Sequence, residues 1–440
     1  MLGAIDEAVA GRRKWWRGRA FRDLVPAVAL VGAVGLAVPW ASGRADRAKI
    51  QRRAAAAIRG GAGTLEYDYQ ASDVSEELGG SPRLRPPGPA WLRDLIGPEY
   101  FQEVCGVTFH RPVAAGEVEA LSSFDQLASL QAQVRPGAGA ALAHLPQFAS
   151  LRSVSLGGAG VTDAAVANLA RSRRLRQVSL DRTLVTDSGL GGLGGLCELR
   201  ALDLTRAPDL TDAGIAPLIA RLPPLRRLRL NETSAGDASI APLARWEGLE
   251  YLNLRSTGIT DAALGSIANC RDLAWLNLGA TGVTDVGVAR LGGMTKLCSL
   301  NLEWDDVTDL GLAELAGLVE LEQLELVGTR VTDAGLAHLA KMTRLTRLGL
   351  PATITDAGLA RLAGMTSLRQ LVLPGARITD AGLAQLHRLR NLSFLMITET
   401  PITPDGIDRL RKSMPNLNRI IHESMPRPSL SRRPAAIRPD

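Results

Sequence analysis

Apolar residues recur in a fixed pattern along most of this chain, from about residue 101 onward. The clearest unit places Leu249, Leu252 and Leu254 at the spacing L-x-x-L-x-L, and Asp261 follows in a short V/I-T-D run. The period predicts about 14 units of 23–26 residues over 101–423, with eroded copies at both ends, as the caps of a repeat array usually are. The units begin at Val104, Leu127, Leu151, Leu175, Leu199, Leu225, Leu249, Leu273, Leu297, Leu321, Leu345, Leu368, Leu392 and Leu417.

These residues resemble the leucine-rich-repeat family, whose pattern is L-x-x-L-x-L-x-x-N/C-x-L, with Thr in place of the Asn or Cys. The I-T-D-x-G-L-x-x-L run that follows is most similar to the cysteine-containing subtype, known from F-box substrate receptors and from many bacterial repeat proteins. Two features depart from that subtype. Only Cys270 occupies its second cysteine position, which Met342 and Met365 fill elsewhere, and no F-box-like helical segment lies upstream.

Each unit predicts one strand and one short helix. Alternate side chains of a strand point to opposite faces, so the leucines of x-x-L-x-L face a core and the residues between them face solvent. We expect the repeated aspartates to be helix N-caps, and Leu336, Leu339 and Met342 to mark the inward face of one helix. Because no unit buries its leucines alone, the fold class is an α/β leucine-rich-repeat solenoid with a parallel concave sheet and short convex helices.

A long apolar segment precedes the array. Leu24–Ser42 contains 19 residues without a charge, and as a helix it would span about 28 Å, close to the thickness of a bilayer core. Trp15, Trp16 and Trp40 flank it, as aromatic anchors do at a membrane interface. We therefore predict one N-terminal transmembrane helix over residues 24–42, preceded by a basic tail over 1–23.

Two questions about this segment stay open in the sequence. A cleaved signal peptide is the alternative to an anchor, because Ala41–Gly43 offers small residues for cleavage; the length of the apolar run favours the anchor. Six basic residues lie on each side, so the positive-inside rule does not orient the helix. The simpler topology for a single-pass membrane protein places the repeat domain on the non-cytoplasmic side.

The remaining segments differ from the array in composition. Residues 43–100 predict a basic juxtamembrane helix at Ala45–Arg59, a strand at Leu65–Tyr69, a Pro-rich linker at Ser81–Pro89, and a helix at Ala90–Gln102 that caps the first strands. Residues 424–440, which contain four Pro, predict a disordered basic tail.

The net charge of +6 comes from the two ends of the chain. Residues 1–60 carry 12 basic and 4 acidic residues, and residues 424–440 carry 4 and 1, which leaves 35 basic against 40 acidic residues between them. A body with a net charge of −5 lacks the basic surface that nucleic-acid binding requires, so we expect no nucleic-acid partner.

No residue pattern indicates catalysis, a metal site or a cofactor. The repeated aspartates resemble a calcium ladder, but each lies a whole repeat from the next and is explained as a helix cap. The five His show no metal-ligand spacing, and no G-x-S-x-G motif is present. Gly191–Gly195 lacks the GK[ST] of a phosphate loop. We predict that the protein is not an enzyme.

The concave face is where ligand specificity is expected, because the solenoid does not dictate the side chains there. Tyr251 and Trp275 stand in neighbouring units beside an Asn row, in a chain with only 4% aromatic residues. Tyr, Trp and Arg are enriched in binding hot spots. The alternative is that the Asn row is a structural ladder and the aromatics bind nothing. The candidate residues are Arg227, Arg229, Tyr251, Asn253, Arg255, Trp275, Asn277, Asn301, Glu303, Trp304 and Glu325.

Two hypotheses about function follow. The first is a membrane-anchored, non-enzymatic leucine-rich-repeat protein that binds a protein or peptide on its concave face. The second is a soluble adaptor of the F-box-receptor kind, acting in protein degradation or signalling, as the resemblance to that subtype implies. The missing F-box-like segment and the apolar N-terminus count against the second hypothesis.

Overall fold

The computed structural model describes residues 46–61, 63–67 and 103–422. The chain forms two compact units, Met1–Gly106 and Val107–Asp440. The predicted basic tail, the anchor at 24–42, the Pro-rich linker, the helix at 90–102 and the C-terminal tail all lie outside the described residues. Within the described ranges, no helix is both long and apolar enough to cross a membrane.

In the first unit a helix covers residues 46–60, and strand β1 (Gly63–Tyr67) follows it. The helix buries one face through Ala48, Ala55 and Ile58, while its basic residues point outward. Arg59 donates a hydrogen bond to the hydroxyl of Tyr67. This contact joins the end of the helix to the end of the strand.

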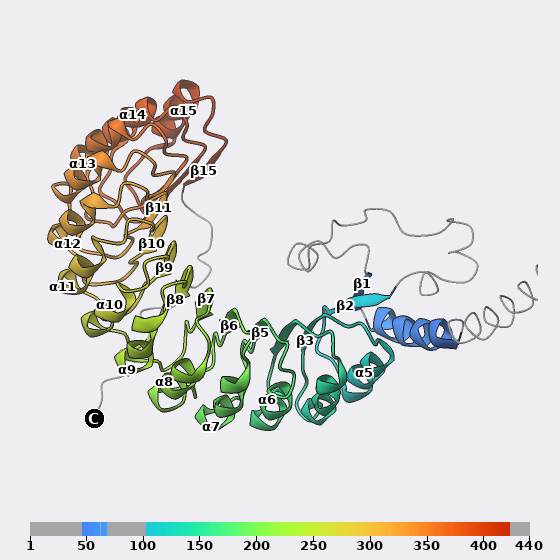
Figure 1. Ribbon diagram of the computed structural model, residues 1–440. Helices are drawn as coiled ribbons and strands as arrows, with labels where there is room; N and C mark the ends of the chain where they lie inside the picture. The colour runs from blue at the N-terminus through green and yellow to red at the C-terminus, as the bar shows by residue number, and fades with distance from the viewer. Residues whose placement is uncertain (1–45, 62, 68–102, 423–440) are drawn as a thin grey trace, which may run out of the picture. The chain divides into compact units, whose positions relative to one another are not determined.

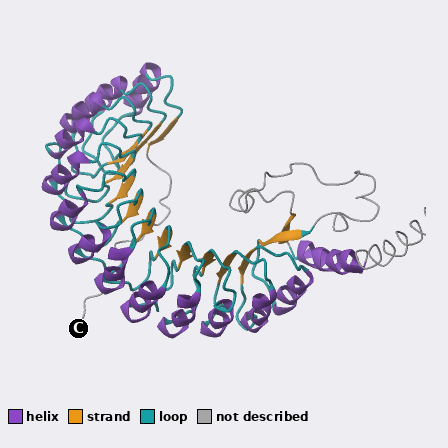
Figure 2. Ribbon diagram, in the orientation of Figure 1, coloured by secondary structure: helices purple, strands orange, loops and turns teal. Residues whose placement is uncertain are grey.

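The second unit is a repeat array with one strand in each repeat. Its strands pair in chain order, and every neighbouring pair from β3 to β15 is parallel. They lie along the inner side of the curved array, and the helices lie along the outer side (Figures 1 and 2). The strands are β2 (Val104–Phe109), β3 (Ser129–Gln133), β4 (Ser153–Gly157), β5 (Gln177–Ser179), β6 (Ala201–Asp203), β7 (Arg227–Arg229), β8 (Tyr251–Asn253), β9 (Trp275–Asn277), β10 (Ser299–Asn301), β11 (Gln323–Glu325), β12 (Arg347–Gly349), β13 (Gln370–Val372), β14 (Phe394–Ile397) and β15 (Arg419–His422).

The strands pair without any shift, so residues at the same repeat position lie beside one another. Leu252 pairs with Leu276, and Leu276 pairs with Leu300. All three are fully buried, whereas Tyr251 and Trp275, which form the row just before the leucines, are partly exposed. The predicted parallel sheet, with its leucines turned inward, is therefore confirmed, and the leucine rows form one continuous core.

The outer side consists of short helices, and the α-helices from α6 to α14 each begin at one of the repeated aspartates. The α-helices are α5 (Ala115–Ala120), α6 (Asp163–Leu169), α7 (Asp187–Leu190), α8 (Asp212–Arg221), α9 (Asp237–Ile240), α10 (Asp261–Ile267), α11 (Asp285–Val288), α12 (Asp309–Glu314), α13 (Asp356–Arg361), α14 (Asp380–Gln385) and α15 (Pro404–Ser413). The 3₁₀ helices are η2 (Leu121–Ser123), η3 (Gly139–Gln147), η4 (Gly191–Gly195), η5 (Ala241–Arg245), η6 (Ala289–Leu291), η7 (Leu315–Gly317), η8 (Gly335–Lys341), η9 (Leu362–Gly364) and η10 (Leu386–Arg388).

The prediction that the aspartates are N-caps is wrong. In α11 the N-cap is Thr284, whose hydroxyl accepts a hydrogen bond from the backbone N–H of Val286 at 3.3 Å. Asp285 is instead the first helical residue. Its carboxylate accepts hydrogen bonds from Thr308, the N-cap of the next helix, at 2.8 Å from the backbone N–H and 2.6 Å from the hydroxyl. Each Asp thus joins its repeat to the following one.

The prediction for the inward helix face is confirmed, with a different helix type. Leu336, Leu339 and Met342 are all buried, but the first two lie in the 3₁₀ helix η8 and Met342 is its C-cap. A 3₁₀ helix has three residues per turn, so residues spaced by three line up on one side. The i, i+3, i+6 spacing of these side chains matches this tighter helix.

Candidate functional site

Tyr251 and Trp275 form a stacked pair on the inner face of the sheet. Their ring centroids are 4.1 Å apart and the ring planes differ by 4°. The two residues are register partners on β8 and β9. Neighbouring strands lie about 4.8 Å apart, so flat side chains at the same repeat position are held almost at stacking distance by the backbone itself.

One end of this stack is capped by an arginine. The guanidinium of Arg229 lies 5.0 Å from the centre of the Tyr251 ring, within the range of a cation–π interaction. Arg229 also pairs with Asp203 on the preceding strand, at 3.4 Å. Arg227 is the register partner of Tyr251 and is exposed on the same strand as Arg229. Two arginines of β7 therefore border the aromatic pair.

The Asn row has a structural role through its side-chain oxygens. The Oδ1 atoms of Asn253, Asn277 and Asn301 each accept a hydrogen bond from the backbone N–H two residues further along, at 3.1, 2.9 and 2.8 Å. Such bonds stabilise the turn that ends each strand. The side-chain oxygens of these asparagines therefore have the structural role that was the alternative to ligand binding. The three asparagines lie in the row next to the aromatic pair.

An ion pair crosses the face beside this row. Nη1 of Arg255 lies 2.6 Å from Oε2 of Glu303, although the two residues follow strands β8 and β10, which are separated by β9. The intervening residue is Gly279, where a Cβ atom would lie 3.0 Å from Arg255 Nη1 and 2.8 Å from Asn301 Oδ1. The glycine leaves the space through which the arginine side chain passes.

Two carboxyl groups near this ion pair are buried. Glu325 is 7% exposed and pairs with Arg347. Burial raises its pKa, and the hydrogen bond and charge of Arg347 oppose that rise. We expected Glu325 to be exposed at the end of the candidate surface, and the structure shows it recessed beside Gly349, where a Cβ atom would overlap its carboxylate.

Asp305 is the more deeply buried of the two acids, at 1% exposure. Its Oδ1 accepts hydrogen bonds from the backbone N–H and the hydroxyl of Thr281, at 2.8 and 3.1 Å. Its Oδ2 is buried without a hydrogen-bond partner within the described part of the chain. Burial raises the pKa of Asp305 to about 8, against the hydrogen bonds from Thr281 and the charge of Arg255.

Trp304 lies apart from the aromatic pair. Its backbone adopts a left-handed conformation, with φ at 65°, and its side chain is 47% exposed. The indole lies against Gly328 of the next repeat, where a Cβ atom would come within 2.5 Å of the ring. Of the candidate residues, Arg229, Tyr251 and Trp275 form one contiguous set and Arg255 and Glu303 form a second, while Trp304 belongs to the turn that follows β10.

Four residues that shape this surface are absent from the candidate residues predicted from the sequence: Asp203, Gly279, Asp305 and Arg347. Asp305 had a detectable signal, because the neighbouring repeats carry Thr257, Thr281 and Thr329 at the same position. In those repeats the Thr257 and Thr329 hydroxyls donate to the carbonyl three residues earlier, at 2.5 and 2.7 Å. An acid cannot make that bond in its ionised form.

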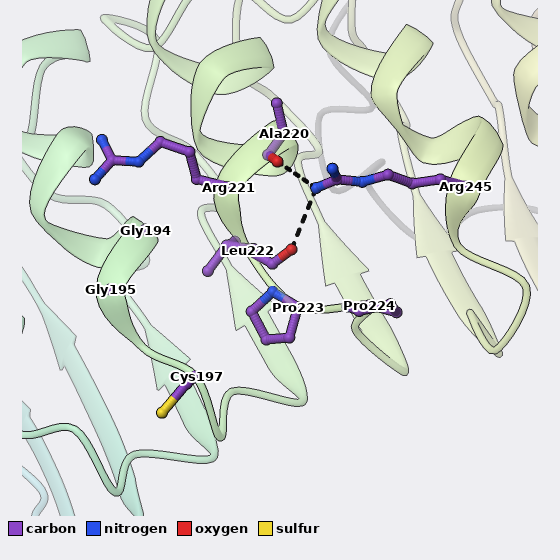
Figure 3. A pocket seen from close by; sticks show the side chains of 9 residues that line it. All are labelled: Gly194, Gly195, Cys197, Ala220, Arg221, Leu222, Pro223, Pro224 and Arg245. Atoms are coloured by element: carbon purple, nitrogen blue, oxygen red, sulfur yellow. Dashed lines mark hydrogen bonds between the residues drawn. The ribbon is translucent and has the colours of Figure 1, made fainter.

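A separate hollow of about 480 Å³ opens on the helix side of the array (Figure 3). It lies where the spacing between units lengthens to 26 residues, from Leu199 to Leu225. Arg245 closes one side by donating to the carbonyls of Ala220 and Leu222 at the end of α8 (Figure 3). The hollow is lined by Gly194, Gly195, Cys197, Ala220, Arg221, Leu222, Pro223, Pro224 and Arg245.

Among the residues that the structure describes, the hollow does not bring a nucleophile and a base together. Cys197 is exposed in the hollow, and no base is among the residues that line it. In the portion of the chain that is described, no three His, Cys, Asp or Glu residues are grouped so that they could hold a metal ion. The inner face of the sheet has the chemistry of a contact surface, with stacked rings, guanidinium groups and carboxylates.

Comparison with known proteins supports the fold. No family model and no curated protein matches the chain. Among solved structures, an internalin from Listeria monocytogenes is 21% identical with a TM-score of 0.54, covering 73% of this chain and 87% of that one. A leucine-rich-repeat protein from Leptospira interrogans is 17% identical with a TM-score of 0.48, covering 68% and 80%. Together with the repeat geometry, the likeness to the internalin identifies a leucine-rich-repeat fold.

Proposed function

We propose that this protein is a non-enzymatic binding protein, anchored in a membrane, that holds a protein or peptide partner on the inner face of its sheet. The observation that carries the proposal is the stacked, partly exposed pair of Tyr251 and Trp275. Large aromatic side chains with one accessible face are the groups that contribute most to binding energy at interfaces. The chain contains only 4% aromatic residues, and it places two of them together here.

Charge and shape around the pair support an extended ligand. Arg227 and Arg229 border the pair on the β7 side, and on the other side Glu303 follows β10, the strand next to that of Trp275. A chain laid across the strands would meet a basic end, then apolar rings, then an acidic end. Opposite charges arranged in this way orient a partner as it approaches.

The test is selection from a random peptide library displayed on phage, using the full chain in detergent as bait. Peptides enriched on the wild type are then measured against Trp275→Ala and Tyr251→Ala by fluorescence anisotropy. We expect each substitution to raise Kd about 30-fold, which corresponds to about 2 kcal/mol. Peptides that bind both variants as tightly as the wild type would place the binding site elsewhere.

The membrane anchor rests on the sequence of residues 24–42 alone. We expect the chain to remain in the membrane pellet after carbonate extraction, and protease added outside the cell to digest the repeat array. A new N-terminus near Ser42–Arg44 in an intact-mass measurement would replace the anchor with a cleaved signal peptide. A soluble cytoplasmic pool would favour the F-box-receptor-like adaptor instead.

A further inference from the structure

A second surface lies where the helices of the array end and the chain turns back toward the strands. The hollow of about 480 Å³ opens there, between η4 and the segment that follows α8. Another hollow of about 300 Å³ shares Cys197, Pro223 and Pro224 with it, so the two adjoin and form one double hollow. The smaller part is lined by Arg176, Cys197, Glu198, Leu199, Arg200, Pro223 and Pro224.

Basic residues gather around this double hollow. Each repeat has a seven-residue segment that ends just before its strand, and four such segments contribute to the lining. They are 170–176, 194–200, 220–226 and 244–250. These segments carry 8 basic and 3 acidic residues, a net charge of +5, whereas the same segments of the next four repeats carry 4 and 3, a net charge of +1. The basic charge is therefore concentrated at the double hollow.

The backbone holds these segments side by side. The backbone N–H of Arg200 donates to the carbonyl of Arg176 at 2.8 Å, in continuation of the pairing of β5 with β6. Arg173 stands one unit before Cys197, at the same repeat position. The side chains of 170–176 therefore lie in the repeat next to the one that carries the exposed thiol.

Four arginines of these segments have no partner of their own. Within residues 103–422, the side chains of Arg171, Arg173, Arg174 and Arg221 are exposed and make no hydrogen bond or ion pair. We call them the free arginines. A guanidinium is charged at every pH at which the protein is folded, so these four positive charges face solvent without a counter-charge from the described chain.

The acidic residues of the same segments do not neutralise the free arginines. Glu198 pairs with Arg176 at 3.5 Å, and Glu250 pairs with Arg226 at 3.0 Å. The third acid, Glu247, belongs to the last of the four segments. Two of the three carboxylates are therefore paired with other arginines.

Arg221 and Arg245 differ in what they offer to a ligand (Figure 3). Nη2 of Arg245 donates to the carbonyl of Ile219 at 2.8 Å and to other carbonyls at the end of α8, which fixes this side chain on the helix. Arg221 lies against Gly194, where a Cβ atom would come within 3.0 Å of its Nε. Its guanidinium thus lies at the wall of the double hollow with its hydrogen-bond donors unused.

We propose that the double hollow and the free arginines bind an acidic segment of a partner protein, with an apolar side chain of that segment seated on Pro223 and Pro224. A carboxylate is the side-chain group that matches a guanidinium, through two parallel hydrogen bonds. The free arginines belong to segments 170–176 and 220–226, which are separated by 194–200, so several carboxylates along an extended chain suit them better than one small anion. The two prolines offer no N–H and favour an apolar contact.

A nucleic acid is the other polyanion that such a surface attracts. Its phosphates follow one another at short, regular intervals, so they would also meet Glu198 and Glu247. A protein segment carries carboxylates only at the positions that face the arginines. The surface therefore suits a protein segment, and it includes neither Tyr251 nor Trp275.

The test measures by fluorescence anisotropy how fluorescein-labelled nonapeptides bind the full-length protein in detergent. One peptide has glutamates on both sides of a central leucine, and the matched peptide has glutamines in their place. We expect the Glu peptide to bind about tenfold more tightly than the Gln peptide, or better. The combined variant Arg173→Gln, Arg174→Gln, Arg221→Gln should raise Kd for the Glu peptide by about tenfold or more.

A matched control removes three charges elsewhere on the helix side. Arg290, Arg361 and Arg388 are exposed and also lack a side-chain partner within residues 103–422. We expect their combined replacement by Gln to leave Kd for the Glu peptide almost unchanged. Trp275→Ala should leave it unchanged as well, because that side chain lies on the sheet. Thermal melting of each variant shows that it is folded.

The thiol of Cys197 reports directly on occupation of the double hollow, because it is exposed there. Saturating Glu peptide should slow the alkylation of Cys197 by N-ethylmaleimide severalfold, as measured by mass spectrometry of the digested protein, and the Gln peptide should not. The partly exposed Cys298 is the internal reference and should react at the same rate with and without peptide.

Four results would overturn the site. They are equal binding of the Glu and Gln peptides, an unchanged Kd in the variant of the free arginines, an equal loss in the control variant, and unprotected Cys197 with the peptide bound. A single-stranded oligonucleotide that binds more tightly than the Glu peptide, and loses binding in the same variant, would assign the surface to nucleic acid instead. The proposed function at Tyr251 and Trp275 stands under each of these results, because its own test uses other residues.

Discussion

The carboxylate of Asp261 accepts two hydrogen bonds from Thr284, although the two residues are 23 positions apart. The backbone N–H donates at 2.8 Å and the hydroxyl at 2.6 Å. At the C-terminal end of the array the same bonds from Thr403 lower the pKa of Asp380. The pairs are Asp163–Thr186, Asp187–Thr211, Asp237–Thr260, Asp261–Thr284, Asp285–Thr308, Asp309–Thr332, Asp333–Thr355, Asp356–Thr379 and Asp380–Thr403.

Removal of one such carboxylate should weaken the contact between two repeats. Asp261→Ala leaves two partly buried donors of Thr284 without an acceptor, so we expect the free energy of unfolding to fall by about 1–3 kcal/mol. Urea unfolding followed by circular dichroism measures the change. As a control, Asp272→Ala removes only an exposed ion pair with Lys296 and should cost at most about 1 kcal/mol. Equal losses in the two variants would contradict the inter-repeat role.

Calcium should not change the stability of the array. In each Asp–Thr pair both carboxylate oxygens accept hydrogen bonds from the next repeat, as Asp285 does from Thr308. Calcium needs six to eight oxygen ligands, which these separated pairs do not supply. The expected result is the same Tm with 5 mM calcium, roughly the millimolar range of weak extracellular sites, as with a chelator. A rise in Tm that Asp261→Ala abolishes would contradict this.

Two adjacent glycines should respond in opposite ways to the same substitution. A Cβ atom on Gly292 would lie 2.8 Å from the backbone carbonyl oxygen of Glu314, whereas a Cβ atom on Gly293 would meet nothing within 4 Å. We expect Gly292→Ala to destabilise the fold by about 1–3 kcal/mol. Gly293→Ala should stabilise it by about 0.4–1 kcal/mol, because the unfolded chain loses freedom. Thermal melts of the two variants, compared in one buffer, test the packing at this point directly.

The buried carboxyl of Asp305 should make the stability depend on pH. Its pKa is raised to about 8, so between the unfolded pKa near 4 and pH 8 the folded chain binds a proton that the unfolded chain releases. Its contribution is therefore fully present below pH 4, roughly the unfolded pKa, and is lost as the pH rises toward the folded pKa. Asp305→Asn keeps an acceptor for Thr281 and removes the titration.

We expect Asp305→Asn to be more stable than the wild type at pH 8, by about 1–3 kcal/mol, and to differ little from it at acid pH. Urea midpoints measured across this range give the comparison. A wild-type curve parallel to that of the variant at every pH would mean that Asp305 does not hold a proton in the folded protein.

Substitutions of Trp275 and of its neighbour Leu276 should lower the stability to different degrees. Trp275 is partly exposed, and truncation to Ala removes a stacking contact, so we expect a loss of about 0.5–1.5 kcal/mol. Leu276, the next residue, is fully buried, and Leu276→Ala should cost about 2–5 kcal/mol. Chemical unfolding measures both. A loss at Trp275 as large as that at Leu276 would indicate that the indole supports the fold.

Much of the candidate surface was predictable because the repeat period sets the register. With one strand per unit, residues at the same repeat position must lie in rows across the sheet, and Tyr251 and Trp275 do so. Their face-to-face stacking was not predictable, since it depends on the rotamers that the two side chains adopt. The reach of Arg255 to Glu303 was not predictable either, because it depends on the space that Gly279 leaves between them.

The sequence by itself determined the solenoid, because a pattern of period 24 allows the leucines to be buried only by stacking units on one another. Only the tertiary structure decided what the polar residues do. The sequence pattern predicts Asp261 as a helix cap, but in the structure its carboxylate accepts hydrogen bonds from a threonine in the next repeat. Asp305 stands at a position where the neighbouring repeats carry Thr, but in the structure it is buried, and burial raises the pKa of its carboxyl. The burial of the leucines follows the repeat period of the sequence. The partners of polar and charged side chains depend instead on which residues the folded backbone brings within reach.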